Sequence, residues 1–255
     1  MARHLLLGLL LAGLTGCWPP SPPPPPLQPA DEAAVEAIAR GEVAPPAPAP
    51  IAPAAPEPCI PERAIALIIA FEIGDPATYE RHYHAPLWPG GQSGATIGIG
   101  YDLGYQPPHV IVTDWHAHAE RERLAKASGV KGKMAKAVAQ GLADVRVPWP
   151  MARDVFDATS LVEHCRMAHR AFPGLGELAP NTRGAIVSVV FNRSAAMAGE
   201  RRREMREIRD TCVPARDAAC VARNIRAMTR IWVGTDIAAG MAKRREAEAV
   251  LAEAA

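Results

Sequence analysis

The chain has 255 residues, of which 22% are charged, and its formal net charge is +1 at neutral pH. This balance gives no indication of a nucleic-acid partner, which a strongly basic chain would suggest. The length allows a leader, a linker and one domain of ordinary size, and no internal repeat is visible.

The first residues have the layout of an export signal. Arg3 gives a basic start, an apolar stretch runs from Leu5 to Gly16, and Cys17 follows. The apolar stretch is too short to cross a bilayer, which takes about 20 residues. The segment "LTGC" resembles the lipobox of bacterial lipoproteins, and this resemblance implies removal of residues 1–16 and a lipid anchor at Cys17.

Trp18, which follows Cys17, allows the membrane that holds the anchor to be predicted. In Gram-negative lipoproteins a residue other than an acidic one at this position implies transfer to the outer membrane, here facing the periplasm. The alternative is an ordinary secreted protein that is cut near Gly16.

Residues 17–60 are dominated by proline and alanine, with "SPPPPP" at 21–26. Such a sequence favours extended polyproline II structure and acts as a semi-rigid spacer. A short helix is conceivable at 31–41, but isolated helices of this length are marginal in water. We therefore expect a tether over residues 17–60 and one globular domain over residues 61–255.

The globular part opens with a pattern typical of a buried helix. Pro61 suits the first helical position, Glu62 suits the positive N-terminal end, and Gly74 indicates the stop. Residues 64–71 between them are apolar on every face, which is typical of a helix buried on all sides.

Glu72 falls in the last turn of this helix, between Phe71 and Ile73. Apolar surroundings favour the protonated form of carboxylic acids, and a general acid has to be protonated. Glu72 is therefore a candidate general acid. The alternative is that it points to solvent or pairs with an arginine for stability.

The segment "SGATIGIGYDLGY" at 93–105 has the pattern of a strand that is interrupted by glycines. Glycine inside a strand often marks a bend or the close approach of a ligand. Thr96 and Asp102 lie six residues apart, hence on one face of a strand, but six extended residues span about 20 Å. A bend at Gly98 or Gly100 would bring Thr96 and Asp102 together and let a ligand lie against the backbone.

The remainder of the chain is expected to be helical. Helices are predicted to start at or near Thr113, Gly132, Pro150 and Gly240 and to cover residues 181–194, 203–212 and 220–232. The expected fold class is α+β, mainly α, with one small early β-sheet and a helical body. The arginine-rich segment 201–210 is interpreted as a solvated helix face.

Four cysteines remain besides Cys17, an even number that suits two disulfides in an exported protein. We expect Cys212 to pair with Cys220, and Cys59 to pair with Cys165.

Two histidine pairs are poor candidates for a metal site. His82 and His84, and likewise His116 and His118, are spaced two apart, which on a helix directs them to different faces. We expect surface histidines, no metal and no cofactor.

Three stretches of this sequence together resemble the phage-type lysozymes, glycoside hydrolase family 24. The run Thr96-Ile97-Gly98-Ile99-Gly100, with Glu72 ahead of it, resembles their conserved strand. Val190-Phe191-Asn192 looks like their core helix, and Trp232 followed by residues 242–247 looks like their closing tryptophan and arginine-rich helix. The resemblance covers most of residues 61–255 and implies a phage-lysozyme-like fold.

The resemblance also implies roles for individual residues. It makes Glu72 the acid, Thr96 the residue that holds a water, and Asp102 the second carboxylate, with Gly98, Gly100 and Tyr101 in contact with the glycan. The usual aspartate of the family lies six residues before the threonine, where this chain has Gly90. Asp102 lies six residues after it, which resembles lysozyme-like toxin domains of the pesticin type.

The implied activity is that of an inverting muramidase that acts in cell-wall degradation or lysis. It would hydrolyse the β-1,4 bond between N-acetylmuramic acid and N-acetylglucosamine in peptidoglycan, as a monomer whose lipid anchor lies in a membrane. One of Lys243, Arg244 or Arg245 would hold Glu72 in place. The alternatives are a lytic transglycosylase, which needs one glutamate and no attacking water, and an inactive wall-binding lipoprotein, which the glycine at position 90 leaves open.

Overall fold

The structure is a computed structural model, and it describes residues 59–254. The expectations for the leader, for Cys17 and for the tether up to residue 58 lie outside these residues. Within the described part, no helix is long and apolar enough to cross a membrane.

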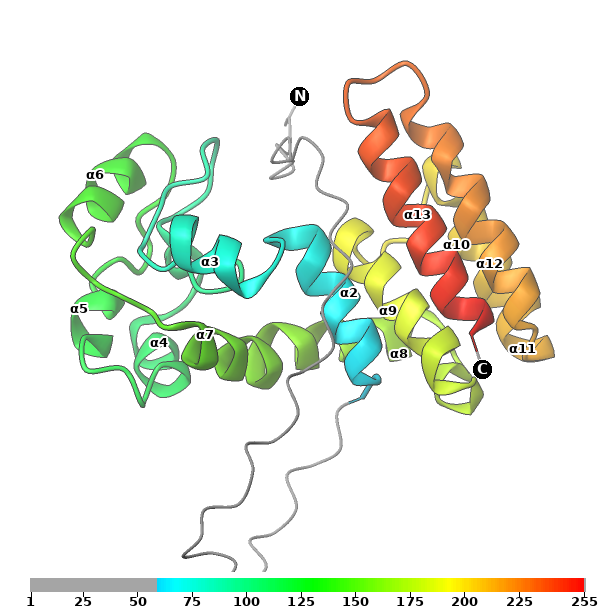
Figure 1. Ribbon diagram of the computed structural model, residues 1–255, viewed down its shortest axis with the longest axis horizontal. Coiled ribbons are helices and arrows are strands. Elements are labelled where there is room, and N and C mark those ends of the chain that lie inside the picture. Colours follow the sequence, from blue (N-terminus) through cyan, green and yellow to red (C-terminus); the bar gives the residue numbers. More distant parts are fainter. Residues whose placement is uncertain (1–58, 255) are drawn as a thin grey trace, which may run out of the picture. The chain divides into compact units, whose positions relative to one another are not determined.

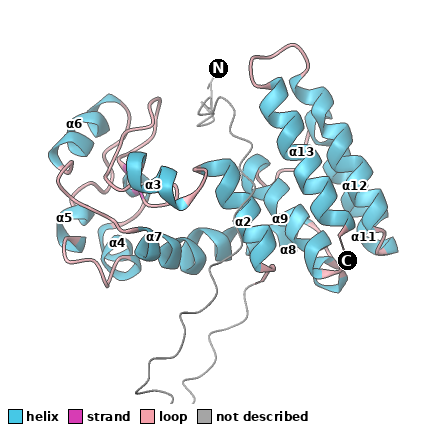
Figure 2. Ribbon diagram, in the orientation of Figure 1, coloured by secondary structure: helices cyan, strands magenta, loops and turns pink. Residues whose placement is uncertain are grey.

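The domain is mainly helical, and in residues 59–254 its sheet consists of two short antiparallel strands (Figure 2). The fold class expected from the sequence is therefore confirmed. The first described helix, α2 (Glu62–Glu72), begins after Pro61 and ends just before Ile73 and Gly74.

Helix α2 packs against α9 (Pro180–Arg193), and α13 (Ala238–Glu253) contacts both α9 and α12 (Ala218–Ala227; Figure 1). The approach of α2 to α9 is close, because a Cβ added at Gly184 would lie 2.4 Å from the Cβ of Ala64. Nearly every residue in the middle of α9 is buried. This helix is thus the centre of the core, and it holds α2 and α13 on its sides.

The expected bend lies between two strands, β1 (Thr96–Ile97) and β2 (Tyr101–Asp102). The strands pair so that Thr96 is opposite Asp102. Both glycines of the turn adopt the left-handed region, with φ of 57° at Gly98 and 77° at Gly100. The turn is therefore the reason for the two glycines, since this conformation disfavours residues with a side chain.

Several short helices surround the hairpin and connect the larger ones. They are η1 (Leu103–Tyr105), α3 (Pro76–His82), α4 (Pro108–Asp114), α5 (Arg121–Ala125), α6 (Lys133–Gly141), η3 (Leu175–Glu177) and η4 (Glu200–Arg202). Helix α3 was not predicted from the sequence, although Asp75 caps it by accepting a hydrogen bond from the Thr78 N–H at 2.6 Å.

The helix predicted from Thr113 is wrong, because α4 ends at Asp114 and the chain turns before α5 starts. His118 lies in this turn and is buried, with Nε2 donating to the carbonyl of Arg146 at 2.9 Å and Nδ1 accepting from the Glu120 N–H at 3.0 Å. The expectation of a surface histidine at this position is therefore wrong too. The hydrogen bond between the His118 side chain and the distant carbonyl of Arg146 thus outweighs the helical pattern of the local sequence.

A π-helical turn interrupts the long helical run from Trp149 to Ala171. The run consists of α7 (Trp149–Phe156), the π-turn η2 (Asp157–Leu161) and α8 (Val162–Ala171). Buried residues follow the usual spacing up to Phe156, but the next one is Leu161, five residues later, and Cys165 follows. The turn thus changes which face of α8 points to the core.

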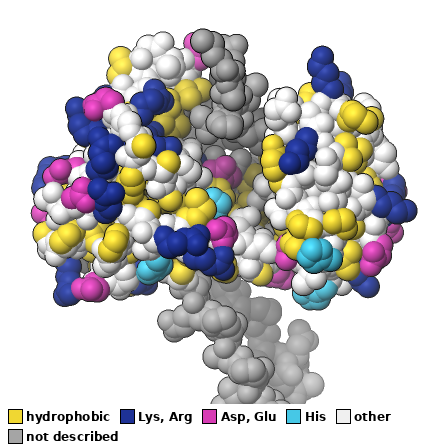
Figure 3. Space-filling view, turned by 180° about the vertical axis from the view of Figure 1, so that it is seen from behind, with side chains coloured by type: hydrophobic (Ala, Val, Ile, Leu, Met, Phe, Trp, Pro, Cys, Tyr) yellow, Lys and Arg dark blue, Asp and Glu magenta, His cyan; other side chains and the backbone are white. Residues whose placement is uncertain are grey.

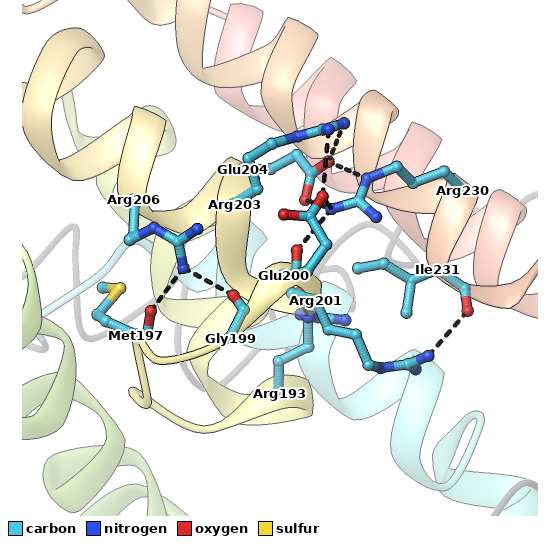
Figure 4. Close-up of polar contacts among 10 residues, drawn as sticks. All are labelled: Arg193, Met197, Gly199, Glu200, Arg201, Arg203, Glu204, Arg206, Arg230 and Ile231. Carbon is cyan, nitrogen blue, oxygen red and sulfur yellow. Dashed lines mark hydrogen bonds and ion pairs between the residues drawn. The ribbon is translucent and has the colours of Figure 1, made fainter.

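The arginine-rich segment is more than a solvated face. It forms α10 (Arg203–Glu207), which continues through η5 (Ile208–Cys212) into α11 (Val213–Ala215), while η6 (Met228–Trp232) follows α12. Arg206 donates to the carbonyls of Met197 and Gly199 at 2.8 and 2.7 Å. Arg203 and Arg230 both contact the buried Glu204, as Figure 4 shows. These arginines hold the loop after α9 in place.

Both expected disulfides are present. Cys212 pairs with Cys220 across a separation of 8 residues, and Cys59 pairs with Cys165 across 106 residues. The second bond ties the start of the domain to the middle of α8.

Candidate functional site

A cleft of about 240 Å³ lies between the end of α2, the hairpin and the helical run α7–η2–α8. The residues that line it come from segments far apart in the sequence: Glu72, Ile73, Tyr83, Leu87, Thr96, Gly98, Ile99, Gly100, Ser160, His164 and Phe191. The fold has thus placed Glu72, Thr96 and both turn glycines around one space.

Glu72 is the last residue of α2 and the only carboxylate among the residues that line this cleft. Its Oε1 accepts a hydrogen bond from Nη1 of Arg244 at 2.8 Å. The Arg244 side chain is 5% exposed and that of Glu72 is 30% exposed. The ion pair therefore connects the edge of the cleft to the interior. Of the three basic residues that were expected to hold Glu72, Arg244 is the one in contact with it.

Behind Glu72 the ion pair continues into a buried network on α13. Nε of Arg244 lies 3.2 Å from Oε1 of Glu248, which also accepts from Arg245 at 3.0 Å and from the Ser188 hydroxyl at 2.7 Å. Two guanidinium groups and two carboxylates balance when Glu72 is ionised. Burial lowers the pKa of Arg245 to about 10, and the charge of Glu248 counteracts this shift.

The network fixes where the Glu72 carboxylate lies. Removing one member of such a buried set would leave an uncompensated charge, which commonly costs about 3 to 5 kcal/mol. The geometry therefore holds the Glu72 side chain in one position at the edge of the cleft.

Thr96 is held by its backbone on both sides. Its N–H donates to the carbonyl of Leu87 at 2.8 Å, its carbonyl accepts from the Leu87 N–H at 3.0 Å, and it pairs with Asp102 in the hairpin. Because the backbone is engaged in this way, the residue keeps a fixed place at the wall of the cleft.

The carboxylate of Asp102 is engaged by backbone N–H groups of residues that do not line the cleft. It accepts hydrogen bonds from the Gly94 N–H, at 3.1 and 3.0 Å to its two oxygens, and from the Gly104 N–H at 2.9 Å. Burial raises the pKa of Asp102, while these two bonds and the charge of Lys131 act in the opposite direction. Asp102 is opposite Thr96 in the hairpin, but it is not among the residues that line the cleft.

Tyr101, expected to touch the glycan, lies in the core instead. Its hydroxyl donates to Oδ2 of Asp114 at 2.6 Å, and its ring packs edge-on against Trp115 with centroids 5.5 Å apart. Burial and the bond to Asp114 raise the pKa of Tyr101. The structure therefore gives this residue a packing role rather than a place in the cleft.

Three polar residues of the cleft were not predicted from the sequence, namely Tyr83, Ser160 and His164. Sequence spacing carried no signal for the last two, because the π-turn decides which face of α8 meets the cleft. No group of three or more His, Cys, Asp or Glu side chains in residues 59–254 is arranged to hold a metal ion.

No protein-family model matches this chain, and among the curated proteins no significant relative is found. The functional argument therefore depends on the residues of the cleft.

Proposed function

We propose that this protein is a glycoside hydrolase that cleaves the glycan strands of peptidoglycan between N-acetylmuramic acid and N-acetylglucosamine. One observation carries the proposal. A single carboxylate, that of Glu72, lies at a cleft that is also lined by Thr96 and by the glycines of the turn that follows it.

Glu72 acts as the general acid in this proposal. It protonates the glycosidic oxygen, and the sugar on the other side of the bond becomes open to attack by water. Arg244 keeps the carboxylate in one position, which a general acid needs for proton transfer within hydrogen-bond reach. Gly100 leaves room for a sugar to lie against the backbone, because a Cβ at this position would meet no atom within 4 Å.

The test is incubation of the full-length protein with purified peptidoglycan, followed by mass analysis of the released fragments. We expect fragments with hydrated reducing ends. Glu72→Gln is expected to lower the rate by about 10² or more, the lower part of the range for a positioned acid.

Glu62→Gln is the matched control, because Glu62 starts the same helix and pairs with Arg153 at 2.7 Å, at the other end from the cleft. We expect it to retain activity. Asp75 and Glu80 are poor controls, since Asp75 caps α3 and Glu80 accepts a hydrogen bond from the Trp149 N–H at 2.9 Å. Intact glycan strands after incubation with the unmodified protein would contradict the proposal.

A lytic transglycosylase is the second candidate, and the orientation of Asp102 favours it. This mechanism needs one carboxylic acid and no attacking water, and Glu72 is the single carboxylate at the cleft. The fragment masses separate the two candidates, because a transglycosylase leaves an anhydro end that is one water lighter than a hydrolysed end.

A further inference from the structure

We propose that His164 is the base of this cleft, and that its Nε2 takes the proton from the attacking water. The inference depends on the proposed hydrolase function and adds the residue that an inverting mechanism needs besides Glu72. In such a mechanism a protonated acid and a proton acceptor face the bond from opposite sides.

The side chains of the cleft leave few choices for this role. Besides Glu72, the polar side chains that line it are Tyr83, Thr96, Ser160 and His164. Hydroxyl groups of serine and threonine do not accept a proton at neutral pH, and burial raises the pKa of Tyr83, which keeps it a phenol. An imidazole is the side chain that accepts protons in this range.

The hydrogen bond at Nδ1 of His164 leaves Nε2 available to accept a proton. Nδ1 lies 2.7 Å from the backbone carbonyl of Ser160. A carbonyl oxygen only accepts, so Nδ1 carries the proton in the neutral ring, and Nε2 is left with a free electron pair. Among the contacts of residues 59–254, no protein group donates to this Nε2 or accepts from it.

Packing of the ring and a disulfide at the next residue add to this hydrogen bond. Its centroid lies 4.1 Å from that of the Phe191 ring, which also lines the cleft. The neighbouring Cys165 is buried and is bonded to Cys59. The π-turn before α8 places Ser160 and His164 on the cleft side, and such turns occur frequently at functional sites.

The proposed reaction is a hydrolysis in which every bond and proton is accounted for. Water loses a proton to Nε2 of His164 while its oxygen bonds to the anomeric carbon. The bond from that carbon to the glycosidic oxygen breaks, and Glu72 gives its proton to the leaving oxygen. The imidazolium then returns its proton, through solvent, to the carboxylate of Glu72.

The test uses the full-length protein and purified peptidoglycan. In His164→Asn, the side-chain amide keeps a donor for the carbonyl of Ser160 but removes Nε2. We expect kcat to fall by about 10² or more with little change in KM. In His164→Ala we expect added imidazole to restore part of the turnover, which a purely structural role would not allow.

Two control variants are needed. His169→Asn changes an exposed histidine on the same helix and is expected to leave turnover unchanged. Asp102→Asn tests the carboxylate that the sequence suggested. We expect it to affect stability more than kcat, since Asp102 binds the backbone of Gly94 and Gly104.

The outcomes separate the inference from the proposed function. Normal turnover of His164→Asn, or loss of turnover in Asp102→Asn alone, overturns the role of His164 while the hydrolase stands. Fragments with anhydro ends only would also overturn it, because no water would attack. Absence of any cleavage by the unmodified protein removes the proposed function itself.

Discussion

Gly98 and Gly100 both have a positive φ, but they differ in what surrounds them. A Cβ at Gly98 would lie 2.9 Å from Cη2 of Trp115, which is buried and cannot move easily. A Cβ at Gly100 would meet no atom within 4 Å. Gly98 is therefore required by backbone conformation and by packing, whereas Gly100 is required by conformation alone.

We expect the two alanine substitutions to differ in stability accordingly. Gly100→Ala should lower the free energy of unfolding by about 1 to 2 kcal/mol, the cost of a left-handed residue with a side chain. Gly98→Ala should cost about 1 to 3 kcal/mol more, because it also overpacks the contact with Trp115. Urea denaturation measures both values, and equal losses would contradict the packing of Trp115 on Gly98.

At the scale of elements, α12 and α13 are joined on their exposed side by Arg226. Its guanidinium binds Glu246 at 3.0 Å and Glu253 at 2.7 Å, so one α12 residue contacts two turns of α13. The bonds to Arg226 lower the pKa of Glu246 and of Glu253 below their ordinary values. These ion pairs supplement the buried contacts between the two helices.

Arg226→Gln should therefore cause a small loss of stability that depends on pH. A carboxylate with a lowered pKa stabilises the fold above its unfolded pKa, and this contribution disappears as the pH falls through the folded value. The difference from the unmodified protein should thus be present at pH 7, decrease once the pH falls below the ordinary glutamate pKa of about 4.3, and vanish below the lowered folded values. Urea denaturation at pH 7 and at a series of lower pH values tests this, with Arg63→Gln at an exposed position of α2 as the control. A difference that persists at the lowest pH would contradict it.

The long helices of this domain were predictable because their signals are local. Pro61 and Gly74 bound α2 as predicted. The expectation that this helix is buried on all sides is wrong, because Ala66 and Ala70 are exposed and the buried residues lie on one face. The break after Asp114 was not predictable, since it depends on the bond from His118 to a carbonyl 28 residues away. The π-turn was not predictable either, because only the packing of Leu161 and Cys165 shows where the buried face changes.

The candidate site, too, was predictable where its signals are local. Glu72 and the bend at Gly98 and Gly100 follow from local patterns, and the structure places Thr96 beside them. The orientation of the Asp102 side chain does not follow, because it depends on the free N–H groups of Gly94 and Gly104. His164 was missed, since its place at the cleft depends on the same π-turn.

At the scale of the whole molecule, basic and acidic side chains are interspersed on the face that Figure 3 shows. Stability at this scale depends strongly on the two disulfides, which close loops of very different length. In the loop-entropy account a longer loop gives a larger stabilisation.

Replacing Cys59 and Cys165 by alanine should lower the free energy of unfolding by about 4 to 5 kcal/mol, and replacing Cys212 and Cys220 by about 2 to 3 kcal/mol. Denaturant unfolding of the two double variants, without reductant, measures both. A larger loss for the short loop would show that strain or packing outweighs loop entropy.

The sequence around Cys17 adds a prediction for the part of the chain before residue 59. We propose that this cysteine carries lipid, as the resemblance of "LTGC" to a lipobox suggests. Cys17→Ser should then move the protein from the membrane fraction to the soluble exported fraction, because several acyl chains anchor stably where one does not. A variant that stays with membranes after a salt wash would rule out the lipid anchor.

The bond between Cys59 and Cys165 also sets the path of mechanical tension through the domain. A force that pulls the chain at residue 58 against the helices after α8 crosses this bond directly, so residues 60–164 bear none of it. Glu72 and the hairpin lie in that unloaded stretch. While the disulfide is intact, the chain between its two cysteines, a separation of 106 residues, cannot be extended. This stretch has a contour length of about 350 Å and becomes extensible when the bond is reduced. The covalent path of the force thus bypasses most of the residues that line the cleft, whereas Phe191 and Arg244 lie on the part of the chain that bears it.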